Sequence, residues 1–365
     1  MRRWAALPHG RGSGARRGSL LIIALWFVVI LSVAAVALGG YLGTETRLMR
    51  YHIAQGQARV WARTGVYLAM QKLALDAKAD DGDWLGDDWA VTLQPDSTAD
   101  PSLWVVPMPP QPPSAVGLTG RVEIQMTDEE RRLDLNSNST NLNVLQRLLG
   151  NPEAAKALFD YRGPPDEGPD TSVQPPYVPK NAPIAAVEEL TDVPHISGEP
   201  AVVAMLQQQG TLTTGGTVNI NTVSATVLKV LVSDVTSYPL IDQLIASRPG
   251  GDGQFGTADD CYTKNISTAA SDLGTCAGLN PAGQNSLIAL LSGLTYGVAS
   301  STFRIRATGV ITKPAIRYTV EAIVTRSSAA SGGSGGGAGG GSTSTGGEEL
   351  PFHEQAFHVL SWREG

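Results

Sequence analysis

An uncharged apolar segment near the N-terminus constrains this chain most strongly. No charged residue lies between Ser19 and Thr44, and most residues there are aliphatic or small. As a helix that rises about 1.5 Å per residue, the segment is long enough to cross a hydrocarbon core of about 30 Å. Five arginines and no acid precede it, and basic residues before a first apolar segment keep that end in the cytoplasm. The sequence therefore predicts a single membrane span with a cytoplasmic N-terminus and the body of the chain on the other side.

Three interpretations of this segment remain open on the residues alone. It could be a cleaved secretory signal, for which Ala34–Ala37 offers small residues at a cleavage site, or it could be a plain anchor. It could also follow a leader over 1–18 that is cut between Gly18 and Ser19, on the cytoplasmic side, so that the apolar helix is retained. The apolar run exceeds the roughly 7–15 residues of a typical secretory signal. Its length and the Arg-Arg-Gly sequence before Ser19 favour the leader.

The helix is predicted to continue to about Leu75, because no proline lies between Glu45 and Leu75 and small or apolar residues recur every three or four positions. A basic leader, a retained apolar helix and an amphipathic continuation together resemble the type IV pilin and pseudopilin superfamily. Most members carry Glu at the fifth residue after the cut, where this chain has Ile23. Loss of that acid resembles the K-type minor pseudopilins of type II secretion systems. A buried acid is costly unless it is paired, and a subunit with nothing above it lacks the partner amino terminus, so Ile23 suggests a filament tip.

Two similar stretches in the middle of the chain predict a duplicated helical unit. Asp134-Leu135-Asn136-Ser137 and Asn219-Ile220-Asn221-Thr222 each precede an apolar-periodic helix, and a second helix then ends near Arg162 or Arg248. Asn, Ser and Thr are good N-caps, and the following glycines are good stops. The unit resembles helix-hairpin-helix or SAM-like modules. It lacks a glycine-rich hairpin that could face a phosphate, so a packing and protein-binding role is favoured over DNA binding.

Further strings resemble the helical insertion of K-type pseudopilins. They are Lys180-Asn181-Ala182-Pro183, Val187-Glu188-Glu189-Leu190 and Leu158-Phe159-Asp160-Tyr161-Arg162. The resemblance spans about residues 10–325. Alternating strand patterns at 120–128 and after the insertion predict a sheet that is split in sequence.

The expected fold is α+β, with a pilin-like long N-terminal helix, an antiparallel sheet and a large inserted helical domain. The expected divisions are a leader over 1–18, a transmembrane and assembly helix over 19–44, an amphipathic helix and the first part of the pilin-like domain over 45–128, the helical insertion with its two hairpin repeats over 129–298, and C-terminal strands over 299–365 with a Gly/Ser-rich loop at 331–347.

Charge and cysteine content bear on partners and compartment. The formal charge is −7 although the leader alone holds five arginines, so the body is acidic and no nucleic-acid partner is expected. Cys261 and Cys276 are the only cysteines. In an oxidising periplasm they are expected to form a disulfide, because no cluster of four zinc ligands surrounds them.

Calcium is the candidate ligand, at the glycine-rich loop that precedes Cys261. Asp252, Asp259 and Asp260 offer three carboxylates there, without the spacing of an EF-hand. Spacing alone leaves a solvated acidic turn equally open, and the family resemblance, whose members bind calcium in the helical domain, favours calcium. A second acidic cluster, at Asp80, Asp81, Asp83, Asp87 and Asp88, is interpreted as a solvated loop.

The resemblance implies a structural subunit and no enzyme, since no catalytic motif stands out among the residues. A prepilin peptidase is expected to cut at Gly18/Ser19 and to methylate the amino group of Ser19. The mature chain, in the inner membrane with a periplasmic body, is expected to join I-type and J-type minor pseudopilins and the inner-membrane secretion platform, and to cap the pseudopilus tip. Two alternatives remain: a minor pilin of a type IV pilus or DNA-uptake machine, and a membrane-anchored periplasmic hydrolase.

Overall fold

The computed structural model describes residues 17–77, 82–90, 103–108, 118–163, 179–326 and 357–365. The chain divides into two compact units, Met1–Gly56 and Gln57–Gly365. Helix α1 (Arg17–Asp76) begins in the first unit and ends in the second, close to the predicted bounds. Among the described residues, α1 is the one helix long and apolar enough to cross a membrane. Residues 1–16 of the leader and the loop at 331–347 lie outside the described residues.

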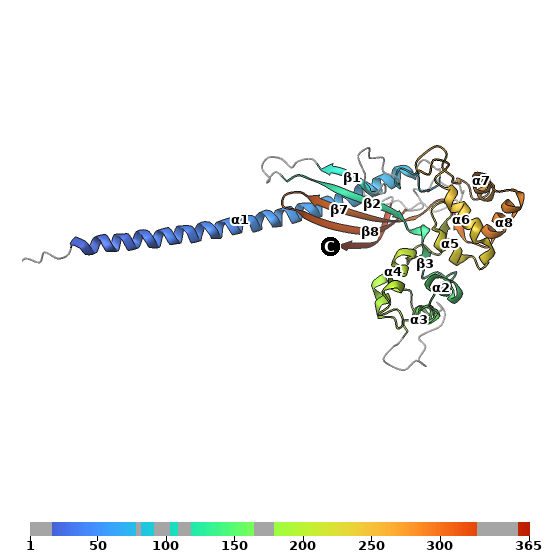
Figure 1. The fold of residues 1–365 in the computed structure, drawn as a ribbon, viewed down its shortest axis with the longest axis horizontal. Helices are drawn as coiled ribbons and strands as arrows, with labels where there is room; N and C mark the ends of the chain where they lie inside the picture. The colour runs from blue at the N-terminus through green and yellow to red at the C-terminus, as the bar shows by residue number, and fades with distance from the viewer. Residues whose placement is uncertain (1–16, 78–81, 91–102, 109–117, 164–178, 327–356) are drawn as a thin grey trace, which may run out of the picture. The chain divides into compact units, whose positions relative to one another are not determined.

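A five-stranded antiparallel sheet forms the pilin-like part of the second unit, and its strand order is β1-β2-β7-β8-β9 (Figure 1). The strands are β1 (Leu103–Met108), β2 (Gly120–Asp128), β7 (Thr302–Ile311), β8 (Ile316–Arg326) and β9 (Phe357–Glu364). Strand β2 pairs with β7 along its whole length, although the helical insertion separates them in sequence. The predicted split sheet is thus confirmed. Strand β1 was not predicted, and its Pro107 is tolerated because β1 is an edge strand.

Small residues bring the second half of α1 close to the sheet. Ala58, Ala62 and Val66 are fully buried, as the predicted apolar stripe requires. At Gly65 an added Cβ would lie 2.5 Å from a methyl of Val122, and at Gly309 it would lie 2.1 Å from the carbonyl oxygen of Ala58. The helix and the sheet therefore touch almost backbone to backbone, a distance that only glycine permits.

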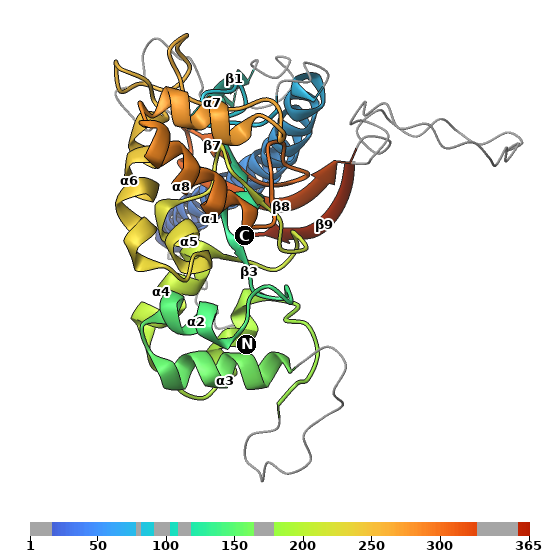
Figure 2. The same ribbon diagram turned by 90° about the vertical axis from the view of Figure 1, so that its right-hand side faces the viewer.

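The helical insertion lies between β2 and β7 and consists of two copies of one unit (Figure 2). The first copy contains β3 (Leu133–Asp134), α2 (Leu142–Leu149), α3 (Pro152–Arg162), η2 (Val187–Asp192), α4 (Pro200–Gln209) and β4 (Gly210–Thr211). The second contains β5 (Val218–Asn219), α5 (Ala225–Leu231), η3 (Val235–Ser237), α6 (Tyr238–Ser247), α7 (Ala269–Cys276), α8 (Pro281–Ser292) and β6 (Tyr296–Gly297). The first and last strands of each copy pair in parallel, and one hydrophobic core runs through both copies.

The end of β9 ties the sheet to its two neighbours. The Glu364 carboxylate accepts hydrogen bonds from Arg59 and Arg63 on α1 and also from Tyr318 and Trp362. On the adjacent residue, the guanidinium of Arg363 forms a two-pronged ion pair with Glu188 of the insertion. Strand β9 thus connects both α1 and the insertion to the sheet edge.

Candidate functional site

The first half of α1 is apolar and has no packing partner within its own unit. Every described side chain from Leu20 to Ile53 is exposed, including Ile23, which is 51% exposed. Gly18 and Ser19 lie in the first turn of the helix. An apolar helix of this length needs a lipid or protein environment, so the segment is a candidate membrane anchor and assembly element.

Two asparagines perform the same task in the two copies of the helical unit. The Asn136 side chain donates to the carbonyls of Ile184 and Leu212 and accepts from the Ile184 amide. The Asn221 side chain donates to the carbonyls of Thr263 and Val298 and accepts from the Thr263 amide. Each asparagine thus satisfies three backbone groups of segments that follow later in its copy, and this explains the shared sequence pattern.

Two buried arginines complete the duplicated plan. Arg162, at the end of α3, donates to the carbonyls of Leu135, Ser137 and Thr140, and Arg248, after α6, donates to those of Ile220 and Val223. Burial lowers the pKa of both guanidinium groups, that of Arg248 to about 9. Each arginine holds the turn that leads into the first helix of its own copy. The predicted duplication is therefore visible in contacts as well as in sequence.

The strings that resemble K-type pseudopilins come together in the first copy. The Asn181 amide donates to the Tyr161 carbonyl. Lys180 and Glu189 form an ion pair at 2.7 Å, and the Tyr161 hydroxyl lies 3.5 Å from the same carboxylate. Because residue 163 is a glycine, the end of α3 can lie close to Asn181. A Cβ at residue 163 would lie 2.4 Å from the Asn181 side chain. The three motif strings therefore contact one another, joining the end of α3 to residues 180–189.

Three consecutive acids anchor the insertion where it leaves the sheet. Asp128 accepts hydrogen bonds from the hydroxyls of Thr222 and Ser300. Glu129 accepts hydrogen bonds from the Arg304 guanidinium and the Thr211 hydroxyl. Glu130 accepts hydrogen bonds from the backbone amide and the hydroxyl of Ser301. All three acids are buried. The three acids thus bind the end of the first copy, the start of the second copy and the strand β7 that follows the insertion. The sequence patterns did not predict these contacts.

The second acidic cluster, which was expected to be a solvated loop, is partly buried in the structure. Asp83 was expected in a solvated loop, but it is only 1% exposed and pairs with Arg326 at 3.0 Å. Arg326 also binds Asp76 at 2.9 Å. Carboxylate oxygens of Asp76, Asp83 and Asp87 lie within 4.8 Å of one another. The guanidinium of Arg326 on β8 thus holds Asp83 in the interior, whereas Asp88 is exposed and Asp80 and Asp81 lie outside the described residues. Arg326 follows so far along the chain that the local sequence pattern could not indicate the pairing.

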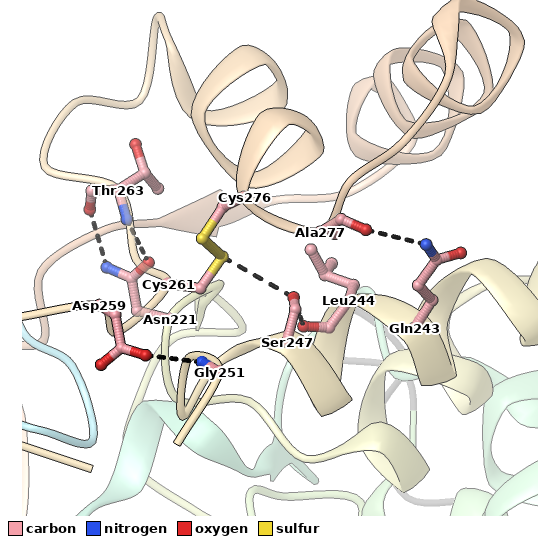
Figure 3. The surroundings of a disulfide bond; sticks show 10 residues. All are labelled: Asn221, Gln243, Leu244, Ser247, Gly251, Asp259, Cys261, Thr263, Cys276 and Ala277. Carbon is pink, nitrogen blue, oxygen red and sulfur yellow. Dashed lines mark hydrogen bonds between the residues drawn. A yellow bond between two sulfur atoms is a disulfide. The ribbon is translucent and has the colours of Figure 1, made fainter. Parts of the chain in front are cut away.

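The two cysteines are bonded to each other in the second copy (Figure 3). Cys261 follows the glycine-rich loop and Cys276 ends α7, with 5.7 Å between their Cα atoms. The bond joins the loop after α6 to the helices that close the copy. The ring of Tyr262, next to Cys261, stacks on Trp84 with centroids 4.1 Å apart, which places the loop against the segment that follows α1.

The loop carboxylates proposed for calcium are held by backbone amides of their own loop. Asp252 accepts from one amide, and Asp259 and Asp260 accept from two each. Hydrogen bonds from Thr257 and the Gly251 amide lower the pKa of Asp259. One oxygen of Asp260, Oδ1, is buried and has no hydrogen-bond partner among the described residues. That orphaned oxygen is open to a cation, but the oxygens of Asp252, Asp259 and Asp260 do not all lie within 4.8 Å of one another, so the structure does not bring the three predicted ligands together.

The comparisons with known proteins agree with this architecture. No protein-family model matches the chain, and no curated protein matches its sequence. Among solved structures, the chain is similar to one in the crystal structure of the GspK-GspI-GspJ complex of the type 2 secretion system of enterotoxigenic Escherichia coli. The two are 17% identical with a TM-score of 0.51, and the match covers 88% of this chain and 99% of that chain. The chain therefore has an α+β pilin-like fold, shared with a chain of that complex.

Proposed function

We propose that the chain is a K-type minor pseudopilin of a type II secretion system. The observation that carries the proposal is the fold match, which covers 99% of the similar chain. The basic leader, the uncharged helix after Ser19 and the motif strings gathered around Tyr161 support the same assignment. At 17% identity the fold is shared but the sequence has diverged, so the function needs a direct test.

Cleavage of the leader and methylation of the new N-terminus provide that test. The full chain is produced together with a type II secretion system and its prepilin peptidase, extracted from membranes, and analysed by intact mass and N-terminal sequencing. The expected product begins at N-methylated Ser19. A chain that begins near Leu38 or still at Met1 contradicts the proposal and favours an anchored protein of another class.

The expected partners follow from the composition of the similar complex. We propose that the mature chain binds I-type and J-type pseudopilins through the apolar part of α1, in the inner membrane, with its body in the periplasm. The wide, double helical insertion blocks further subunits above it, and Ile23 leaves no acid that needs a subunit above. The chain then acts as a tip cap that helps start pseudopilus assembly on the secretion platform, and as a structural subunit without catalysis.

Calcium remains a proposal for the loop before Cys261. An ion bound there would be held by Asp260, and Asp252 and Asp259 would have to move toward it to complete the site. The measurement is thermal unfolding of the full chain in detergent, first with EDTA and then with calcium chloride. Calcium should raise the midpoint for the parent chain and for Asp160→Asn, a control in α3 whose carboxylate pairs with Lys156, but not for Asp260→Asn. An equal rise in all three chains would contradict the site.

A further inference from the structure

A group of buried and half-buried charged side chains lies where the helical insertion joins the sheet. We call it the junction cluster, and it comprises Asp76, Asp83, Asp87, Asp128, Glu130 and Arg326. Its members lie at the end of α1, in the segment that follows α1, at the end of β2 and in η1, and at the end of β8. The insertion leaves the sheet at Asp128 and returns at Ser300, so the cluster occupies the point at which the two parts are attached.

Hydroxyl and amide groups connect the acids into one network. The Ser300 amide donates to Asp83 at 2.6 Å, and the Ser300 hydroxyl donates to Asp128 at 2.7 Å. The Asn219 side chain donates to the Asp83 carbonyl and to the Ser300 hydroxyl, and Thr222 donates to Asp128. Through these contacts the second helical copy is held by Asp128 at the end of β2 and by Asp83 in the segment after α1.

The charge of the network is unbalanced. Five carboxyl groups face one guanidinium, that of Arg326, which binds Asp76 and Asp83. Lys72 on α1 interacts electrostatically with Asp76 and with the exposed Asp88. In the described residues of the second copy and the returning segment, the groups with hydrogen bonds to the network are amides and hydroxyls, from Asn219, Thr222, Ser300 and Ser301. Carboxylates crowded in a buried site with one cation repel one another when all are ionised.

Burial and this repulsion raise the pKa of several members. Burial, and then the neighbouring Glu130, raise the pKa of Asp128 to about 7. Burial, and then Asp83, raise that of Asp76 to about 7, and burial raises that of Asp87 to about 8. Acids whose folded-state pKa is raised stabilise the fold fully below their unfolded pKa, near 3.8, and this contribution is lost as pH rises through 7 to 8.

We propose that the junction cluster is a proton-operated latch that sets how firmly the helical insertion is held on the sheet. In mildly acidic surroundings its carboxyl groups take up protons and the attachment is tight. In alkaline surroundings they ionise together, repel one another and loosen the attachment. The latch concerns the fold of this chain alone and does not depend on its place in a filament.

Hydrogen exchange of the full chain in detergent, with EDTA present, tests the latch. Protection is measured by mass spectrometry at about pH 6 and about pH 8.5 and corrected for intrinsic exchange. One titrating group with a folded-state pKa of about 7 makes the closed state about tenfold more favoured at the lower pH. Peptides covering 218–223 and 296–302 should therefore be at least about tenfold better protected at pH 6. The centre of β7 should change little.

Two substitutions and a matched control identify the groups responsible. Asp128→Asn keeps an acceptor for Thr222 and Ser300 but cannot ionise, so it should raise protection at pH 8.5 and reduce the pH ratio by about tenfold. Glu130→Gln serves if that variant fails to fold. Asp88→Asn removes an exposed charge from the same acidic segment and should retain the parental ratio. Equal protection at both pH values, or the same ratio in Asp128→Asn as in Asp88→Asn, would overturn the latch.

Discussion

Arg162 and Arg248 occupy equivalent positions in the two copies of the helical unit, and each donates to carbonyls of the turn before its own first helix. The two copies differ at the first residue of their shared motif, which is Asp134 in the first copy and Asn219 in the second. Asp134 of the first copy accepts from the amides of Asn136 and Thr214, whereas its counterpart Asn219 lies beside the acids of the junction cluster. An amide at that position avoids adding a further carboxylate to a site that already holds five.

Replacing Arg248 with Met should destabilise the second copy. The substitution leaves the carbonyls of Ile220 and Val223 buried without donors, at a cost of about 3 kcal/mol. The free energy of unfolding is measured by urea denaturation of the full chain in detergent. Arg306→Met, at an exposed position on β7, is the control and should change it by less than about 0.5 kcal/mol. Equal effects of the two substitutions would show that Arg248 does not hold the turn.

Gly309→Ala tests the close contact between α1 and the sheet. The new methyl group would meet the carbonyl of Ala58, and because that atom belongs to backbone, the helix itself must shift. We expect a loss of about 2 kcal/mol or more in the free energy of unfolding. Gly293→Ala, where the nearest atom is 3.6 Å from the added Cβ, should be nearly neutral. A neutral Gly309→Ala would mean that α1 is not packed this tightly.

The sequence patterns predicted α1, the split sheet and the duplicated unit because each depends on local periodicity or on repeated motifs. They did not predict the partner of Asp83, because Arg326 follows only after the whole insertion and nothing local links the two residues. The same reason applies to the acids at 128–130, whose partners are Thr211, Thr222, Ser300 and Ser301. Strand β1 was missed because its proline and the proline-rich segment nearby are typical of loops.

Glu364→Gln should loosen strand β9. Hydrogen bonds from Trp362, Arg63, Tyr318 and Arg59 lower the pKa of Glu364 to about 2. A depressed pKa means that its contribution is present above the unfolded pKa, near 4.5, and is lost as pH falls toward 2. At neutral pH, amides of 357–364 should exchange faster in Glu364→Gln, whereas Glu199→Gln, at an exposed position, should leave them unchanged. Unchanged exchange in Glu364→Gln would contradict the role of this carboxylate.

Removing the disulfide should destabilise the second helical copy. A bridge between residues separated by 15 positions is worth about 3 kcal/mol through the entropy of the unfolded chain. The double substitution Cys261→Ala and Cys276→Ala should lower the midpoint of thermal unfolding, and a reducing agent should lower it for the parent chain only. A reducing agent without effect on the parent chain, under conditions that expose its thiols to mass labelling, would contradict a stabilising bond.

Isolation of the chain with its partners tests the central proposal most directly. The tagged full chain is produced with the I-type and J-type pseudopilins and the prepilin peptidase of one type II secretion system, and the detergent-extracted complex is analysed by native mass spectrometry. We expect a complex that contains both subunits together with a mature chain beginning at Ser19. A correctly processed chain that retains neither subunit would contradict its assignment as a K-type minor pseudopilin.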